Sequence, residues 1–235
     1  MRVLIVMHNQ QPSNEIVAKL EVCGRTHELT VSSLLLGVLA SGASGVGKTA
    51  SVLHPLLRQA IAFSSGDQHA KIGLLVLDSA REGTSALVCQ WATESGRAAD
   101  VVLVPIKSES LCSMEARDLD ALVARVAADG KIVVLTIPNG HEKHRESAAR
   151  LKAHLCKVLQ SRAAYDSHRL VGITEDDLPV TPATAAEIRD IAWNLQTLRQ
   201  RRGFVAFGTQ WPADTCTNAG WYELVSNIGH RFVLS

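Results

Sequence analysis

Short apolar runs alternate with longer amphipathic segments along most of the chain. The runs are four to seven residues long and rich in Val, Ile and Leu, which favours buried strands. Continuous apolar strands joined by crossover helices predict a mostly parallel sheet with helices on both faces, an α/β fold. The expected strands are 34–40, 72–77, 101–106, 132–137, 170–173, 204–207 and 231–234. The expected helices are 48–63, 84–95, 116–127, 141–160, 184–201 and 218–226.

The first 30 residues do not follow this alternation. We expect residues 1–30 to form an N-terminal lead-in that is β-rich or the remnant of a longer region, and residues 31–235 to form the main domain. A chain of 235 residues with 46% hydrophobic residues can bury a sizeable core. Aromatic residues make up only 4%, so aliphatic side chains must fill that core.

Charge and cysteine content narrow the class of protein. The net charge of +1 gives no evidence from bulk charge for a nucleic-acid or membrane surface. The basic residues within 143–169 are a candidate DNA-facing surface, although a solvated helix face explains them better. Five scattered cysteines without a CxxC pair are typical of a reducing cytosol. No apolar run is long enough to span a bilayer.

The strongest motif is GASGVGKT, at residues 42–49, between an apolar run and a helical pattern. It matches GxxxxGK[ST], a loop whose glycines let successive backbone N–H groups face phosphate oxygens. The helix that follows would direct its positive dipole end at the same anion. Lys48 would reach the β- and γ-phosphates of ATP, and the Thr49 hydroxyl would bind Mg²⁺. The expected nucleotide-binding residues are Gly42, Ala43, Ser44, Gly45, Val46, Gly47, Lys48, Thr49 and Ala50.

Hydrolysis would also need a carboxylate at a strand end, and the chain offers two places for one. Asp78 follows the run GLLVL, and Glu175 and Asp176 follow LVGIT. We favour Glu175 as the water-polarising group and, with Thr49, as a ligand of Mg²⁺, with Asp176 sharing the metal or base role. Which of these residues faces the loop stays open, because Thr174 is a candidate for the position that usually holds an aspartate in such enzymes.

A third polar strand end is GFVAFGTQ, which closes on Thr209 and Gln210. We expect Gln210 to sense the γ-phosphate or the attacking water. The arginines Arg199, Arg201 and Arg202 precede this strand, and Arg202 is our candidate for a charge-stabilising group that acts on a neighbouring subunit's nucleotide.

These segments, in this order, resemble the motor domain of conjugative coupling proteins, type IV secretion ATPases of the FtsK–HerA group. The resemblance covers most of residues 30–235 and rests on ASGASGVGKT, GLLVLDSAREG, FVAFGTQWPAD and ELVSNIGHRFVLS. It implies a RecA-like fold, ATP and Mg²⁺ as ligands, a homo-oligomeric ring such as a hexamer, and movement of DNA or a protein–DNA substrate. It also implies a cytoplasmic location, at the inner face of the membrane through secretion-system proteins.

The sequence departs from that family at several points. DSARE stands in place of DPKGE, ITEDD in place of an apolar-Asp-Glu strand, and the membrane helices and the inserted all-helical domain have no counterpart. These departures keep a second function open, a nucleotide-dependent accessory or regulatory protein with little hydrolysis. A third function, a P-loop kinase that acts on a small molecule, fits less well, because the sequence shows no lid or acceptor site.

Overall fold

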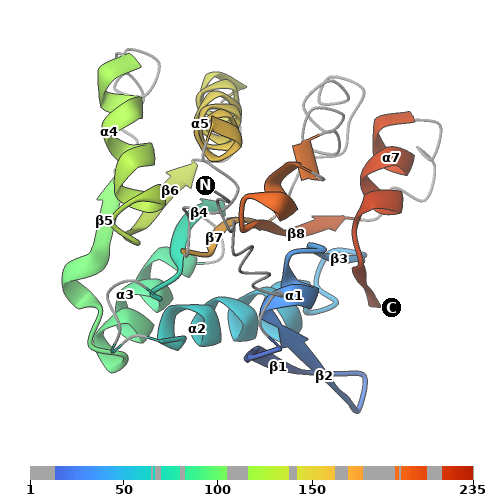
Figure 1. Ribbon diagram of the computed structural model, residues 1–235. Coiled ribbons are helices and arrows are strands. Elements are labelled where there is room, and N and C mark those ends of the chain that lie inside the picture. The colour runs from blue at the N-terminus through green and yellow to red at the C-terminus, as the bar shows by residue number, and fades with distance from the viewer. Residues whose placement is uncertain are drawn as a thin grey trace, which may run out of the picture.

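The computed structural model gives the arrangement of most of the expected elements (Figure 1). Its elements alternate between strand and helix, as the apolar pattern indicates. Expected features that fall on other residues, such as the greater part of helix 184–201, lie outside the described part of the chain. The described residues are 14–64, 66, 70–79, 83–104, 116–137, 142–161, 169–176, 194–195, 197–210 and 219–234.

The centre of the fold is a seven-stranded sheet with the strand order β5-β6-β4-β7-β8-β3-β9. Every pairing among these strands is parallel, so their carboxyl ends meet at one edge. The α/β fold class with a parallel sheet is therefore confirmed. The strands are β3 (Val38–Gly42), β4 (Gly73–Ser79), β5 (Val101–Val104), β6 (Ile132–Ile137), β7 (Val171–Glu175), β8 (Gly203–Gln210) and β9 (His230–Leu234).

Helices cover both faces of the sheet, as Figure 1 shows. One face carries α4 (Ala116–Ala127), α5 (Glu142–Ser161) and α7 (Ala219–Asn227), the upper helices in that view. The other face carries α2 (His54–Ala62) and α3 (Thr84–Glu94). A short helical turn, η2 (Ala98–Asp100), leads from α3 into β5. Because both faces are covered, the central strands are apolar on both sides and form two separate cores.

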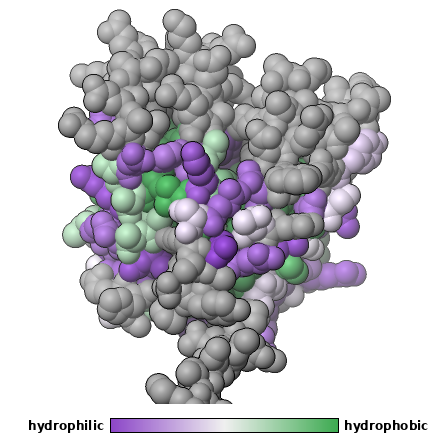
Figure 2. Space-filling model, turned by 45° about the horizontal axis from the view of Figure 1, so that its top comes forward, coloured by the Kyte–Doolittle hydropathy of each residue, from purple (hydrophilic) through white to green (hydrophobic). Residues whose placement is uncertain are grey.

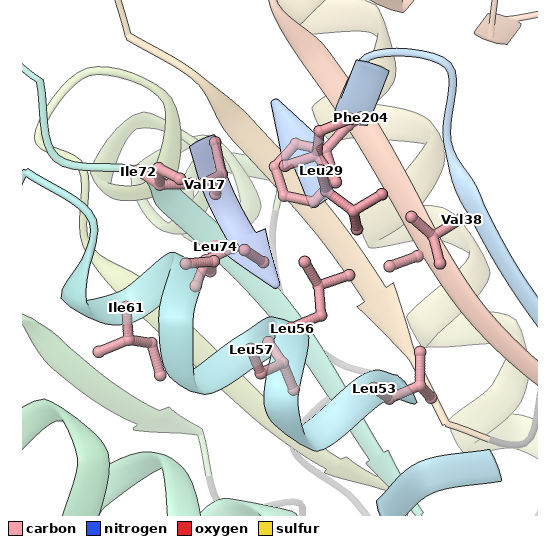
Figure 3. Close-up of a cluster of buried hydrophobic side chains, with 14 of the residues drawn as sticks. Val17, Leu29, Val38, Leu53, Leu56, Leu57, Ile61, Ile72, Leu74 and Phe204 are labelled. Carbon is pink, nitrogen blue, oxygen red and sulfur yellow. The ribbon is translucent and has the colours of Figure 1, made fainter. Parts of the chain in front are cut away.

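An antiparallel hairpin, β1 (Ile16–Val22) and β2 (Arg25–Thr30), packs against α2. Its apolar side chains Val17 and Leu29 join Leu56 and Leu57 of α2 in one buried cluster (Figure 3). The side-chain amide of Gln59 donates to the carbonyl oxygen of Lys19 at 2.9 Å and accepts from its N–H at 2.8 Å. The hairpin is thereby fixed to the helix that follows the glycine-rich loop.

The expected strand 34–40 is shorter in the structure, because a helix ends at Leu34 and a turn follows before the strand begins. Helix α1 (Val31–Leu34) is held by a capping box. The Thr30 hydroxyl accepts from Ser33 N–H at 3.1 Å, and the Ser33 hydroxyl accepts from Thr30 N–H at 2.9 Å. Gly37 then turns the chain with φ +80° and β3 begins at Val38. The two hydroxyl groups therefore outweigh the strand tendency of the apolar run.

A buried charge network lies at the amino end of the sheet. The Asp100 carboxylate accepts hydrogen bonds from Lys71 Nζ (3.0 Å), Arg97 Nε (3.1 Å) and Lys131 Nζ (2.9 Å). The fully buried Arg97 guanidinium also donates to the carbonyl oxygens of Ile61, Ile72 and Gly130. Arg97 therefore connects the end of α2 to the residue before β4 and to the turn between α4 and β6.

Few large apolar side chains reach the surface among the described residues. On the face shown in Figure 2, hydrophobic residues gather in one area that hydrophilic residues border. The exposed large side chains are Ile16, Leu36, Leu103, Tyr222 and Val233. In the part of the chain that the structure covers, no helix has the length and apolar character needed to cross a membrane.

Candidate functional site

The glycine-rich loop leaves the carboxyl end of β3, which is the neighbour of the edge strand β9. β3 pairs with β8 on one side and with β9 on the other, so three strand ends surround the loop. Ser41 and Gly42 are buried at the end of β3, whereas Ala43, Ser44 and Gly45 are exposed at the tip of the loop. The loop is therefore anchored in the sheet and presents its tip to solvent.

Glycine is required at the start of the loop for lack of space. A Cβ atom on Gly42 would lie 2.3 Å from the carbonyl oxygen of Leu234 in β9, and its φ is +155°. Gly45 and Gly47 have φ values of +81° and +85°, a region that side chains with a Cβ rarely adopt. The spacing of the glycines thus follows from the path of the backbone, as the loop motif predicts.

Lys48 is held inside the curve of this loop. Its side chain is buried, and its ammonium donates to the carbonyl oxygens of Gly42 at 3.0 Å and Ala43 at 2.7 Å. A buried ammonium next to the exposed loop tip creates local positive charge, and the helix that begins at Thr49 adds the positive end of its dipole. Both effects favour an anion at the loop.

The helix after the loop begins with a wide π turn, η1 (Thr49–Leu53), before α2 continues it. The His54 N–H donates to the carbonyl oxygen of Thr49, five residues back. Pro55 explains the widening, because it has no N–H and its ring would crowd the Ser51 carbonyl in an ordinary α turn. Single π turns of this kind occur often at functional sites.

An aspartate from a strand two positions away in the sheet reaches the first residue of this helix. The Thr49 hydroxyl donates to Asp176 Oδ1 at 2.8 Å, and Asp176 directly follows β7. β8 lies between β3 and β7, so the loop and the acidic strand end are brought together by the sheet order. A hydroxyl and a carboxylate side by side are oxygen ligands of the kind that Mg²⁺ prefers.

Glu175 lies on the opposite face of the sheet from Asp176. Side chains alternate along β7, and Glu175 shares the side of Ile173, which packs in the α4–α5 core. There Glu175 Oε2 accepts from Lys152 Nζ of α5 at 2.5 Å, and both side chains are buried. The structure thus places Asp176, and not Glu175, at the Thr49 hydroxyl.

Lys152 belongs to the basic segment 143–169, which the sequence offers as a candidate DNA-facing surface. The structure buries this lysine against Glu175. Arg169, at the other end of the segment, donates to the carbonyl oxygen of Lys71 at 2.8 Å. Lys152 and Arg169 therefore make contacts within the fold. Lys157 is exposed, and the side chains of the remaining basic residues, Lys143, Arg145, Arg150 and Arg162, lie outside the described part of the chain.

Gln210 is at the expected strand end. It is the last residue of β8, it is exposed, and it pairs in register with Gly42. Thr209 is fully buried. The side chain of Gln210 therefore starts from a point beside the loop, and its role as a sensor of phosphate or water stays a prediction.

The three arginines lie at the other end of β8. Arg202 immediately precedes the strand, and eight strand residues separate it from the loop side, a span of roughly 26 Å at about 3.3 Å per residue. Arg199 donates to the carbonyl oxygens of Leu36 at 3.4 Å and of Asn227. Arg202 has φ +59°, and burial lowers the pKa of its guanidinium. Arg202 is thus too far from the loop of its own chain to act there.

The acidic strand end that the sequence offered as an alternative, Asp78, has a contact of its own. Its Oδ2 accepts from Ser85 N–H at 3.0 Å in the first turn of α3. Among the described residues, no group of three or more His, Cys, Asp or Glu side chains has a metal-binding arrangement. A magnesium ion at this edge would therefore depend on Thr49, Asp176 and the phosphates of a nucleotide, which is how Mg²⁺ is usually held in such sites.

Comparison with known proteins finds similarity of fold among solved structures and none in sequence. No family model matches the sequence. No curated protein matches it either. Among solved structures, one similar protein is described as an ATPase, with a TM-score of 0.54, 9% identity, and coverage of 96% of this chain and 75% of that chain.

Two further structures come from named systems. The cytoplasmic domain of EssC matches with a TM-score of 0.50 and 11% identity, covering 93% of this chain and 36% of that one. The bacterial conjugative coupling protein TrwB matches with a TM-score of 0.50 and 12% identity, covering 93% and 72%. This chain therefore spans about a third of the EssC domain. At such identities the likeness is one of fold, and the chain has the fold of a RecA-like P-loop ATPase similar to a conjugative coupling protein.

Proposed function

We propose that the protein binds and hydrolyses ATP as the motor domain of a coupling-type ATPase that moves DNA or a protein–DNA substrate. The observation that carries the proposal is the hydrogen bond between Thr49 and Asp176, beside the buried ammonium of Lys48. It joins the phosphate loop to a carboxylate from a distant strand, and phosphoryl-transfer sites need both parts. The likeness of fold to a conjugative coupling protein supports the choice of substrate.

Each residue has a defined part in this proposal. Lys48 and the N–H groups of the loop bind the β- and γ-phosphates, and Thr49 and Asp176 hold Mg²⁺. When bound, the ion neutralises charge that develops on the phosphates. Gln210, at the next strand end, orients the attacking water. Arg202 stabilises charge on the nucleotide of a neighbouring subunit in a homo-oligomeric ring, because it lies far from its own loop.

A second candidate function, a nucleotide-dependent accessory protein with little hydrolysis, is favoured by one specific contact. Glu175 would have to leave its ion pair with Lys152 before it could polarise water on the other side of the sheet. Separating a buried ion pair costs on the order of 3–5 kcal/mol when one charge is left alone. In the accessory protein that pair stays closed, so turnover is slow and the bound nucleotide acts as a switch.

One experiment separates the two functions. ATP hydrolysis is measured on protein of known oligomeric state, alone and with single-stranded or double-stranded DNA, with Lys48→Ala as the inactive control. The motor is supported by turnover that DNA stimulates and that Lys48→Ala abolishes. Tight ATP binding with turnover that DNA leaves unchanged would support the accessory protein. Absence of ATP binding would refute both.

A further inference from the structure

A second aspartate near the loop has a buried oxygen without a partner. Asp78 ends the apolar stretch of β4 and is 1% exposed. Its Oδ2 accepts from Ser85 N–H at 3.0 Å, but its Oδ1 is buried and has no hydrogen-bond partner in the described part of the chain. Buried polar atoms are nearly always paired, so an unpaired carboxylate oxygen requires an explanation.

A capping role for α3 does not explain the charge. The bond to Ser85 needs a single acceptor oxygen, which a neutral asparagine would supply as well. Burying a carboxylate costs free energy because both oxygens lose their water. Here only one of the two oxygens makes a hydrogen bond that offsets this cost. The carboxylate at position 78 is therefore more costly than its visible contact requires.

The position of Asp78 in the sheet connects it to the loop. β4 and β7 are parallel neighbours in which Leu77 pairs with Glu175, and the Asp176 N–H donates to the Leu77 carbonyl oxygen at 3.4 Å. Asp78, the residue after Leu77, is therefore at the same level of the sheet as Asp176. Along β4, Asp78 shares the side of Leu74 and Val76, which pack in the core under α2 and the hairpin.

The helix that follows confirms on which side Asp78 lies. The Thr84 hydroxyl, at the start of α3 and next to Ser85, is 3.1 Å from His54 Nε2, and His54 is the first residue of α2. The start of α3 thus lies against the first residue of α2, directly after the π turn that begins at Thr49. Asp78 accepts a hydrogen bond from that same start of α3. It therefore lies on the side of the sheet where Thr49 contacts Asp176, a place that we call the corner of Thr49 and Asp176.

Thr174 adds a second buried oxygen to the same side of the sheet. It pairs with Val76 in register, is 3% exposed, and its hydroxyl oxygen finds no partner among the described residues. Glu175, the next residue, points to the other face. Two buried polar oxygens on neighbouring strands therefore face the corner of Thr49 and Asp176, and together they suit a small, strongly polar ligand.

We propose that Asp78 is a positioning residue for hydrated Mg²⁺, an inference that rests on the proposed function. Mg²⁺ gives up its waters reluctantly and usually keeps several of them in nucleotide sites. A water whose lone pair faces a cation has only protons to offer, so it needs acceptors around it. The second oxygen of Asp78 is such an acceptor, and Thr49 and Asp176 hold the ion itself. Outer partners of this kind commonly change metal affinity by about 10- to 100-fold.

The test is Asp78→Asn, which keeps an acceptor for Ser85 and replaces the other oxygen with an N–H donor. We measure ATP affinity without divalent ions, the Mg²⁺ concentration that half-saturates the ATP-bound protein, and thermal unfolding of the protein alone. We expect unchanged metal-free ATP affinity, a melting temperature at or above that of the wild type, and a Mg²⁺ requirement raised by about 10- to 100-fold. Asp78→Ser, which has no carboxylate and whose shorter side chain gives up the contact with Ser85 N–H, should raise the Mg²⁺ requirement to a similar extent and lower the melting temperature.

The matched control is Glu94→Gln, which removes one negative charge from the exposed side of the same helix α3, where Glu94 pairs with Arg58. It should leave the Mg²⁺ requirement unchanged. Wild-type Mg²⁺ dependence in Asp78→Asn would show that Asp78 only caps α3, and unfolding of both Asp78 variants would also overturn the proposal. A wild-type protein that fails to bind ATP with Mg²⁺ at all would refute the proposed function, and this inference with it.

Discussion

Replacement of Asp100 by asparagine should destabilise the protein severely without touching the nucleotide site. Asp100 is 9% exposed in its side chain and is the shared acceptor of three cationic side chains. Burial alone would raise the pKa of its carboxyl, but hydrogen bonds from Lys131, Lys71 and Arg97 more than offset this and lower the pKa to about 2. The charged carboxylate is thus strongly preferred in the folded state.

Two estimates bound the effect. The fall of the pKa from about 3.8 to about 2 corresponds to about 2 kcal/mol, the cost of neutralising the carboxyl in place. Asparagine also removes an acceptor oxygen and leaves the buried cations Lys71 and Arg97 without a countercharge, a situation that costs about 3–5 kcal/mol. We therefore expect Asp100→Asn to lower the free energy of unfolding by about 3–5 kcal/mol, a large fraction of the stability of a typical domain.

Denaturant unfolding at neutral pH and at several acidic pH values checks this prediction. The lowered pKa means that the stabilisation is complete above the unfolded-state pKa of about 3.8 and is lost as the pH falls towards about 2. The wild type should lose stability across that interval, and Asp100→Asn should lose correspondingly less. A loss below 1 kcal/mol at neutral pH, or an unchanged acid profile, would refute the argument from the cations that surround Asp100.

Three further outcomes test the site and the assembly. Lys48→Ala should abolish or strongly weaken ATP binding, because the ammonium beside the loop is lost; unchanged affinity in a titration would remove the loop from the site. Glu175→Gln should lower stability by about 3–5 kcal/mol by removing the buried negative charge that pairs with Lys152, and the apolar pair Lys152→Met with Glu175→Leu should restore most of it; loss of turnover at full stability would instead support the water-polarising role. Arg202→Gly should keep or raise stability by up to about 1 kcal/mol, since Arg202 has φ +59°. The same variant should lose turnover while still binding ATP if Arg202 acts on a neighbouring subunit, and unchanged turnover at saturating protein concentration would exclude that role.

The parts of the site that could be predicted from sequence are those set by local spacing. The loop from Gly42 to Thr49 is fixed by glycine positions and by the elements on each side of it, and Gln210 is fixed as the end of an apolar strand. Such features need no knowledge of which strands are neighbours. Helix α1 was missed because its two capping hydroxyls, Thr30 and Ser33, stand at the edge of an apolar run that by itself favours a strand.

The choice between Glu175 and Asp176 could not be made from sequence, for a physical reason. β7 is buried on both faces, so its residues show no alternation of polar and apolar positions that would reveal which side faces the loop. Which side chains of β7 face the loop is decided by how β7 pairs with β4 and β8, and those strands are distant in the sequence. A signal for Lys152 did exist, because it is adjacent to the apolar stripe of Leu151, Leu155 and Leu159 on one side of α5, where a lysine needs a buried partner.

Two buried aspartates at opposite ends of the same sheet lead to opposite expectations. Asp100, at the amino end, uses both oxygens and faces three cations, so its charge stabilises the fold. Asp78, at the carboxyl end, uses one oxygen for a helix cap and keeps the other buried without a partner among the described residues. Replacement by asparagine should therefore destabilise the first and spare the second. If the two substitutions separate in this way, the charge of Asp78 is retained for a ligand and not for folding, because a carboxylate that the fold does not need would otherwise be replaced at no cost.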